Sequence, residues 1–187
     1  MDNKIFMSVI AVTLMSAIVL TLVIPGPASI STVFPVVSSG INYRAYVCIY
    51  KNGELQECSH NLLYNAGKNI TRDLLGGGSS GTIRNITLCN ASAGTTSCAA
   101  PIADASESFV EYNGCGLTSA TGTYNTINSN DGNWSIVATF TSSCDNRITN
   151  VTRLKNATGG LFASNTFTSV TLQTNDQLTV NWTISVV

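Results

Sequence analysis

The chain has 187 residues, of which only 10% are charged, and its net charge is −1. Globular proteins usually carry about 25% charged residues, so serine, threonine, asparagine and glycine must supply most of the polar surface here. A nearly neutral chain lacks the basic field with which proteins attract nucleic acid, and we therefore expect no nucleic-acid partner.

The N-terminus begins with an apolar run, Ile5–Ile24, that is long enough to span a bilayer. It is followed by Gly26-Pro27-Ala28, which places small residues at positions −3 and −1 of a signal-peptidase site before Ser29. We expect residues 1–28 to be a signal peptide. The alternative is a retained membrane anchor, and contact with a membrane is expected only through residues 5–24, before or without cleavage.

Residues 29–40 form a short strand-like segment and a linker. The more apolar phase of the segment is Ile30, Thr32, Phe34 and Val36. Pro35 lacks a main-chain donor, which suits an edge position. The segment is expected either to form the first strand of its own sandwich or to be donated to a groove on a neighbouring copy. A head-to-tail contact of the second kind need not close, and it then builds a filament.

The remaining residues, 41–187, show the short alternating stretches of a single all-β domain. We expect strands at Tyr43–Tyr50, Leu55–Ser59, Thr82–Leu88, Ser106–Tyr112, Gly116–Ile127, Asn133–Thr141, Ile148–Leu154, Phe167–Leu172 and Leu178–Val186. One helical period spans Asn61–Leu75 and stops at Gly76-Gly77-Gly78. This pattern predicts a β-sandwich of Greek-key or jelly-roll kind with one short helix, preceded by the apolar leader or anchor helix.

Two of these strands alternate cleanly between apolar and polar residues. In Asn133–Thr141 the apolar phase includes Trp134 and Phe140, and in Leu178–Val186 it includes Trp182. We expect these phases to face the core and the polar phases to face solvent.

Seven Asn-x-Ser/Thr sequons predict N-linked glycans and an extracellular body. They lie at Asn69, Asn85, Asn90, Asn133, Asn150, Asn156 and Asn181. Two of them, Asn133 and Asn181, fall on the polar phases of the alternating strands, where a glycan must point.

The six cysteines beside a leader predict disulfides. A hairpin centred between Ser129 and Asn130 pairs residues whose numbers sum to 259, as those of Cys115 and Cys144 do. Cys89 and Cys98 enclose a short Ser/Thr/Gly loop. Cys48 and Cys58 then pair by elimination, although a two-residue turn at Asn52-Gly53 places them on opposite faces unless the hairpin contains a bulge or a different loop.

No pattern for catalysis emerges, and we expect neither an enzyme nor a metal or cofactor beyond the glycans. The single histidine, His60, has no partner at a telling spacing. Glu107 and Glu111 share a strand phase, which a solvated face explains. Asp131 and Asp176 occupy turns, where Asx hydrogen bonding accounts for them.

The layout of leader, apolar N-terminal strand, disulfide-bearing all-β domain and many sequons resembles the subunits of archaeal surface filaments called threads, found on thermoacidophilic crenarchaea. The resemblance implies a homopolymer built by donor-strand complementation, with Ile30, Thr32, Phe34 and Val36 as donor residues and the sequon asparagines as glycan sites. It also implies a secreted cell-surface filament that serves in adhesion or biofilm.

Asn61-Leu62-Leu63 with Ala66-Gly67 is similar to β-domains of archaeal and viral surface proteins. This keeps a membrane-anchored surface or virion glycoprotein as the alternative function. A type IV-like pilin is less favoured, because its peptidase would cut before the apolar run, after Lys4.

Overall fold

A computed structural model describes residues 43–93, 98, 109–128 and 132–186. The expected signal peptide or anchor and the donor residues Ile30, Thr32, Phe34 and Val36 lie outside these residues. So do the turn residue Asp131 and the carboxylate of Glu107. No helix in the described part of the chain is long and apolar enough to cross a membrane.

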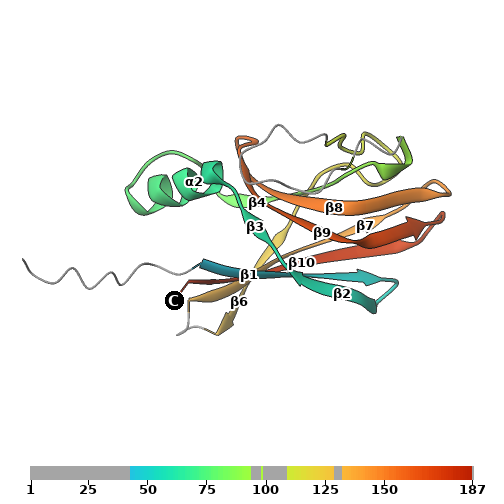
Figure 1. The fold of residues 1–187 in the computed structure, drawn as a ribbon, viewed down its shortest axis with the longest axis horizontal. Coiled ribbons are helices and arrows are strands. Elements are labelled where there is room, and N and C mark those ends of the chain that lie inside the picture. Colours follow the sequence, from blue (N-terminus) through green and yellow to red (C-terminus); the bar gives the residue numbers. More distant parts are fainter. Residues whose placement is uncertain (1–42, 94–97, 99–108, 129–131, 187) are drawn as a thin grey trace, which may run out of the picture. The chain divides into compact units, whose positions relative to one another are not determined.

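The fold is the predicted β-sandwich, made of two antiparallel five-stranded sheets with the orders β2-β1-β10-β7-β6 and β3-β9-β8-β4-β5 (Figure 1). We call these sheet A and sheet B. The strands are β1 (Tyr43–Lys51), β2 (Glu54–His60), β3 (Leu62–Leu63), β4 (Ile83–Leu88), β5 (Ala120–Thr121), β6 (Thr123–Asn128), β7 (Asn133–Thr141), β8 (Arg147–Asn156), β9 (Leu161–Leu172) and β10 (Gln177–Val186). The helix α2 (Asn65–Leu75) and the 3-10 turn η2 (Ala91–Ala93) complete the described elements.

The core lies between the sheets, and the two strands with the cleanest alternation supply much of it. Along β10 the inward side chains from Leu178 to Ile184 are at most 1% exposed. Along β7, Ile136 and Phe140 are buried in the same way, whereas Trp134 packs against the core while only partly buried. The predicted inward phases of both strands are confirmed, and the outward positions are half-buried or exposed except for Ser135, which is 7% exposed.

Both sides of the sandwich contain a segment that crosses from one sheet to the other. On one side Asn61 joins β2 to β3, and its main-chain N–H donates to the Ala45 carbonyl at 3.3 Å. On the other side Gly122 joins β5 to β6, and its N–H donates to the Arg84 carbonyl at 2.8 Å. A Cβ on Gly122 would lie 2.6 Å from Cγ2 of Ile136, so this corner requires glycine.

Several predicted boundaries are wrong. The helix begins at Asn65, because Leu62–Leu63 pairs with β9 as a short strand. The expected strand Gly116–Ile127 is divided into β5 and β6 by the corner between the sheets. In the described part of the expected strand Ser106–Tyr112, only isolated bridges form, at Phe109 and Glu111. In the last two segments, β-propensity correctly predicted extended chain. Which strand or sheet the segment then pairs with depends on tertiary contacts.

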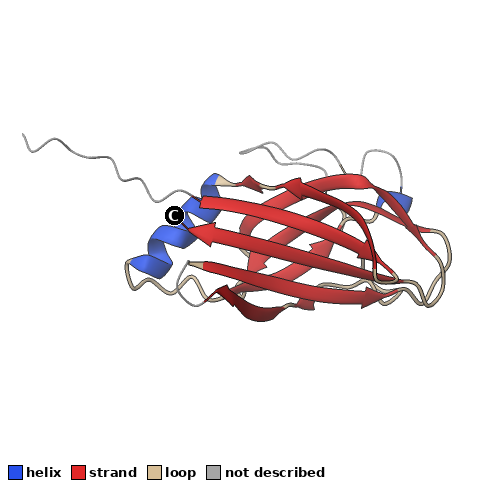
Figure 2. Cartoon of the chain, turned by 90° about the horizontal axis from the view of Figure 1, so that it is seen from below, coloured by secondary structure: helices blue, strands red, loops and turns tan. Residues whose placement is uncertain are grey.

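The helix α2 lies at one end of the sandwich, the same end at which β1 begins and β10 finishes (Figures 1 and 2). Gly67 brings α2 against β9, since a Cβ there would collide with the Phe162 carbonyl. Ile70 is 7% exposed and anchors the same face of the helix. The C-terminal end of α2 is less well covered, because Leu74 is 43% and Leu75 is 71% exposed.

Candidate functional site

The Cys48–Cys58 disulfide forms across the β1–β2 hairpin because the hairpin contains a bulge. Near the turn, Lys51 pairs with Glu54 and Tyr50 with Leu55, but the register then shifts by one residue. The shift places Cys58 directly opposite Cys48, with the two Cα atoms 4.1 Å apart. The bulge that the sequence required for this bond is therefore present, and the disulfide lies on the outward face of sheet A.

The other two disulfides join Cys89 to Cys98 and Cys115 to Cys144, as expected. The register used to predict the second was wrong by one, because the paired numbers from Thr123 with Val137 to Thr126 with Trp134 sum to 260. The bond forms beyond that ladder, where the Ser143 N–H donates to the Cys115 carbonyl at 2.9 Å.

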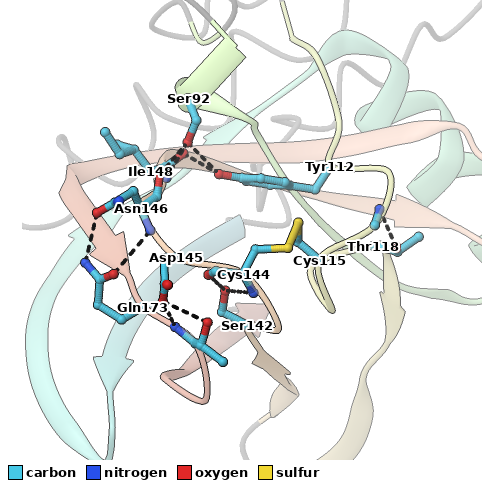
Figure 3. The surroundings of a disulfide bond; sticks show 12 residues. Ser92, Tyr112, Cys115, Thr118, Ser142, Cys144, Asp145, Asn146, Ile148 and Gln173 are labelled. Carbon is cyan, nitrogen blue, oxygen red and sulfur yellow. Dashed lines mark hydrogen bonds between the residues drawn. A yellow bond between two sulfur atoms is a disulfide. The ribbon is translucent and has the colours of Figure 1, made fainter.

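Hydrogen bonds fix the loops around Cys115–Cys144 (Figure 3). The Ser142 hydroxyl donates to the Cys144 carbonyl at 2.7 Å, and Tyr112 donates to the Ile148 carbonyl at 2.8 Å. All six cysteines are bonded and none is free. Three disulfides indicate that the protein folds in an oxidising, extracellular environment.

Six of the seven sequon asparagines have side chains that reach the surface in whole or in part. Asn69 is exposed on α2, and the others are half-buried: Asn85, Asn90, Asn133, Asn150 and Asn181. Asn133 and Asn181 lie on the outward phases of β7 and β10, as expected. Glycan occupancy at these six positions stays a prediction.

Asn156 is different, and the structure argues against a glycan there. Its side chain is 3% exposed. Its Nδ2, the atom to which an N-glycan is attached, donates to the Ser80 carbonyl, and its Oδ1 accepts from the Gly160 N–H and from the Thr158 hydroxyl. Asn156 thus organises the turn between β8 and β9, a role that its sequon pattern did not indicate.

The titratable residues considered for chemistry are placed in structural roles. His60 lies against Tyr46, with the ring centroids 4.2 Å apart, and Glu111 forms an ion pair with Lys155. Asp176 accepts from the Asn52 amide and from the Gln173 N–H and pairs with Lys51, and these contacts lower its pKa to about 2. Among the described side chains, no three histidine, cysteine, aspartate or glutamate residues gather into a potential metal site.

The edges of the two sheets are possible contact sites, because an unpaired edge strand offers main-chain hydrogen-bonding groups to another chain. The two edge strands of sheet B, β3 and β5, have only two residues each. In sheet A, β2 carries Glu54 and Glu57 and the bulge described above. Short length, charge and bulges all discourage pairing with another strand.

The remaining edge, β6, is longer than β3 and β5 and carries no charge, although its ladder with β7 shifts in register between Thr126 and Asn128. Its six residues, Thr-Tyr-Asn-Thr-Ile-Asn, include no charge and no proline. Tyr124 is 47% and Ile127 is 54% exposed along it. We call this strand the β6 edge. Its composition favours extended structure, so it is suited to accept an additional strand.

An apolar groove of about 350 Å³ lies between α2 and the ends of the two sheets. Tyr43 and Trp134 of sheet A, Phe162 and Ile83 of sheet B, and Leu74 of α2 contribute to its walls. Burial raises the pKa of the Tyr43 hydroxyl, and the hydrogen bond from the Asn61 amide only partly offsets this increase. The Tyr43 side chain therefore stays uncharged. We call this feature the α2 groove.

The β6 edge and the α2 groove are close together in the fold. Thr126 of β6 is the register partner of Trp134, whose side chain lines the groove. Sequence reasoning found neither feature, although it did find Leu74 and Trp134 as apolar positions. The signal for the edge was the absence of any charge from Thr123 to Asn128. By contrast, β2, at the opposite edge of sheet A, contains two glutamates.

Comparisons with protein-family models, with curated proteins and with solved structures find no match to this chain. The structure therefore agrees with the family suggested by the sequence only in its general architecture. It is an antiparallel two-sheet sandwich with three disulfides.

Proposed function

We propose that this protein is a secreted, N-glycosylated structural subunit of an extracellular filament. Each copy donates its Ile30–Val37 segment to the β6 edge of the next copy and so extends sheet A by one strand. The observation that carries the proposal is the β6 edge itself, which carries no charge and pairs on one side with no other strand of the described residues.

The donated segment has the properties that such an edge needs. Its phase Ile30, Thr32, Phe34 and Val36 is mostly apolar, and side chains of an added strand would lie beside Tyr124, which shares the inward phase of its register partner Ile136 and is now exposed. Burying each large apolar side chain contributes about 1.5–3 kcal/mol, and the new main-chain hydrogen bonds add to this. Pro35 removes one donor, which an added outermost strand tolerates.

The predicted glycans leave this contact open. Asn133 and Asn181 lie on the outward faces of β7 and β10, and β6 itself contains no sequon. Glycans at these positions would extend from the outward face of sheet A, and the one on Asn133, the register partner of Asn128, would start one strand away from the β6 edge. A role in adhesion or biofilm agrees with a glycan-coated polymer whose partners are further copies of itself.

The proposal is tested by removing the donor and by blocking the edge. Deletion of Ile30–Val37 should leave soluble monomers in sedimentation velocity and no filaments in negative-stain electron microscopy. Thr126→Lys places a charge on the β6 edge and should also prevent assembly. Its matched control is Gln56→Lys on β2, the opposite edge of sheet A, which should assemble normally. Filaments formed by the deletion variant would contradict the proposal.

A membrane-anchored surface or virion glycoprotein is the second candidate, because Ile5–Ile24 is long enough to span a bilayer. The two functions differ at the mature N-terminus. Mass spectrometry of the native protein should find a terminus at or near Ser29 for the filament subunit. An intact Met1 would favour the anchored form.

A further inference from the structure

The α2 groove is an apolar space that none of the described side chains fills. Its volume of about 350 Å³ is near the lower end of the range for ligand pockets, about 300–1,000 Å³, and suits one or two large apolar side chains. Among the described residues that line it, Lys68 alone is charged, and its Nζ donates to the Asn65 side chain at 3.0 Å. The groove therefore favours an uncharged, apolar occupant.

Its position links it to the β6 edge. Trp134 in the groove wall is paired with Thr126, so it stands one strand away from the edge. A strand added to β6 would lie two strand spacings, about 10 Å, from β7. Inward-pointing side chains of such a strand are directed toward the same space between the sheets into which Trp134 points.

The chain that precedes β1 contains two apolar segments, Ile5–Ile24 and Ile30–Val37. Only the second remains after the expected cleavage, and it has no charged residue. In strand addition, main-chain hydrogen bonds supply affinity and pockets for alternate side chains supply specificity. Phe34 is the largest side chain in the apolar phase of this segment.

We infer that the α2 groove receives the Phe34 side chain of the Ile30–Val37 strand donated by a second copy. This inference rests on the proposed function. It assigns the α2 groove, in addition to the β6 edge, to the contact between subunits. The junction between subunits then has two parts, because β6 pairs with the main chain of the donated strand and the α2 groove selects the side chain.

A filled groove tests the inference. Thr71 lies in the groove wall on α2, and Thr71→Trp reduces the space for Phe34. The full-length secreted variant should need a concentration about 10- to 100-fold higher than wild type to assemble. Ala66→Trp is the matched control, since Ala66 is exposed on α2 and does not line the groove. It should assemble as wild type does.

Rescue identifies the occupant. Combining Thr71→Trp with Phe34→Ala should restore assembly toward the wild-type level, because the new indole takes the space that Phe34 leaves. Leu74→Trp offers a second groove-filling variant if Thr71→Trp lowers the melting temperature. Normal assembly of a folded groove-filling variant, or the absence of rescue by Phe34→Ala, would overturn the inference.

A mixing experiment separates this inference from the proposed function. A copy that lacks Ile30–Val37 keeps its groove, and a copy with Thr71→Trp keeps its donor strand. Together they should form a discrete one-to-one complex in sedimentation velocity. If the deletion abolishes filaments while Thr71→Trp does not, strand donation stands and the groove assignment fails. If the deletion variant still forms filaments, strand donation itself fails.

Discussion

Removing the sequon at Asn156 provides a direct test of the fold, because two different substitutions remove it. Asn156→Ala deletes the buried amide, and Thr158→Ala deletes the hydroxyl that completes the Asn-x-Thr pattern. Both abolish any glycan at this position. Their effects on stability should nevertheless differ, since Asn156 is buried and bonds three groups, whereas Thr158 is exposed and contributes one of these bonds.

The size of the difference follows from the hydrogen bonds. Asn156→Ala leaves the Ser80 carbonyl and the Gly160 N–H without their side-chain partner and empties the buried space that the amide occupies. An unsatisfied buried polar group costs about 1–3 kcal/mol, so a loss of about 2–4 kcal/mol in the free energy of unfolding is expected. For a domain of this size, this lowers Tm by roughly 4–16 °C. Thr158 is exposed, and its alanine variant should lose about 1 kcal/mol or less.

Calorimetry and intact-mass spectrometry of the secreted proteins provide the two readouts. Neither substitution should change the glycan mass, and only Asn156→Ala should lower Tm strongly. A loss of one glycan mass in both variants, with equal Tm, would show that Asn156 carries a glycan. The reasoning from its burial would then be wrong.

Two other predictions concern the disulfides and the response to acid. Replacing Cys115 and Cys144 by serine should lower the free energy of unfolding by about 1 kcal/mol more than replacing Cys48 and Cys58, because the first pair is 29 residues apart and the second only 10. Urea unfolding of the two double variants measures this difference. A larger loss for the shorter loop would contradict the loop-entropy argument. The lowered pKa of Asp176 means that its ionised form stabilises the fold above about pH 4, and that this contribution is lost as the pH falls through about 2. The Tm of wild type should therefore exceed that of Asp176→Asn at neutral pH, and the gap should narrow below pH 4; a gap that does not change with pH would refute the assignment.

The alternating strands could be predicted from sequence because their signal is local. In β7 and β10 the period of two continues over the whole strand, so the inward positions of Ile136 and Trp182 follow directly. The division into two sheets follows less directly. Gly122 marks the corner between β5 and β6, but its meaning depends on the closeness of Ile136, which is distant in sequence.

Register and accessibility were harder, because both depend on single residues whose effect is not local. One bulge in β2 turns an unfavourable Cys48–Cys58 pairing into a direct one. An irregularity between Thr126 and Asn128 breaks the ladder between β6 and β7. Asn156 shares its sequon pattern with Asn69, and only the packing of the turn after β8 distinguishes the buried residue from the exposed one. The composition of Thr123–Asn128 shows that this strand carries no charge, but its place at the edge of sheet A follows only from the pairing of the other strands.

The position of β1 between β2 and β10 in sheet A also has a mechanical consequence. β1 is held by β10 along nine consecutive residue pairs, from Tyr43 with Val186 to Lys51 with Leu178. A pull on the chain ahead of Tyr43, directed along the strand, would slide β1 past β10 and strain all of these hydrogen bonds together. Opening the pairs one after another would require a force across the strands instead. The Cys48–Cys58 bond adds a covalent link from β1 to β2, so the strand that first receives tension is also tied to its other neighbour.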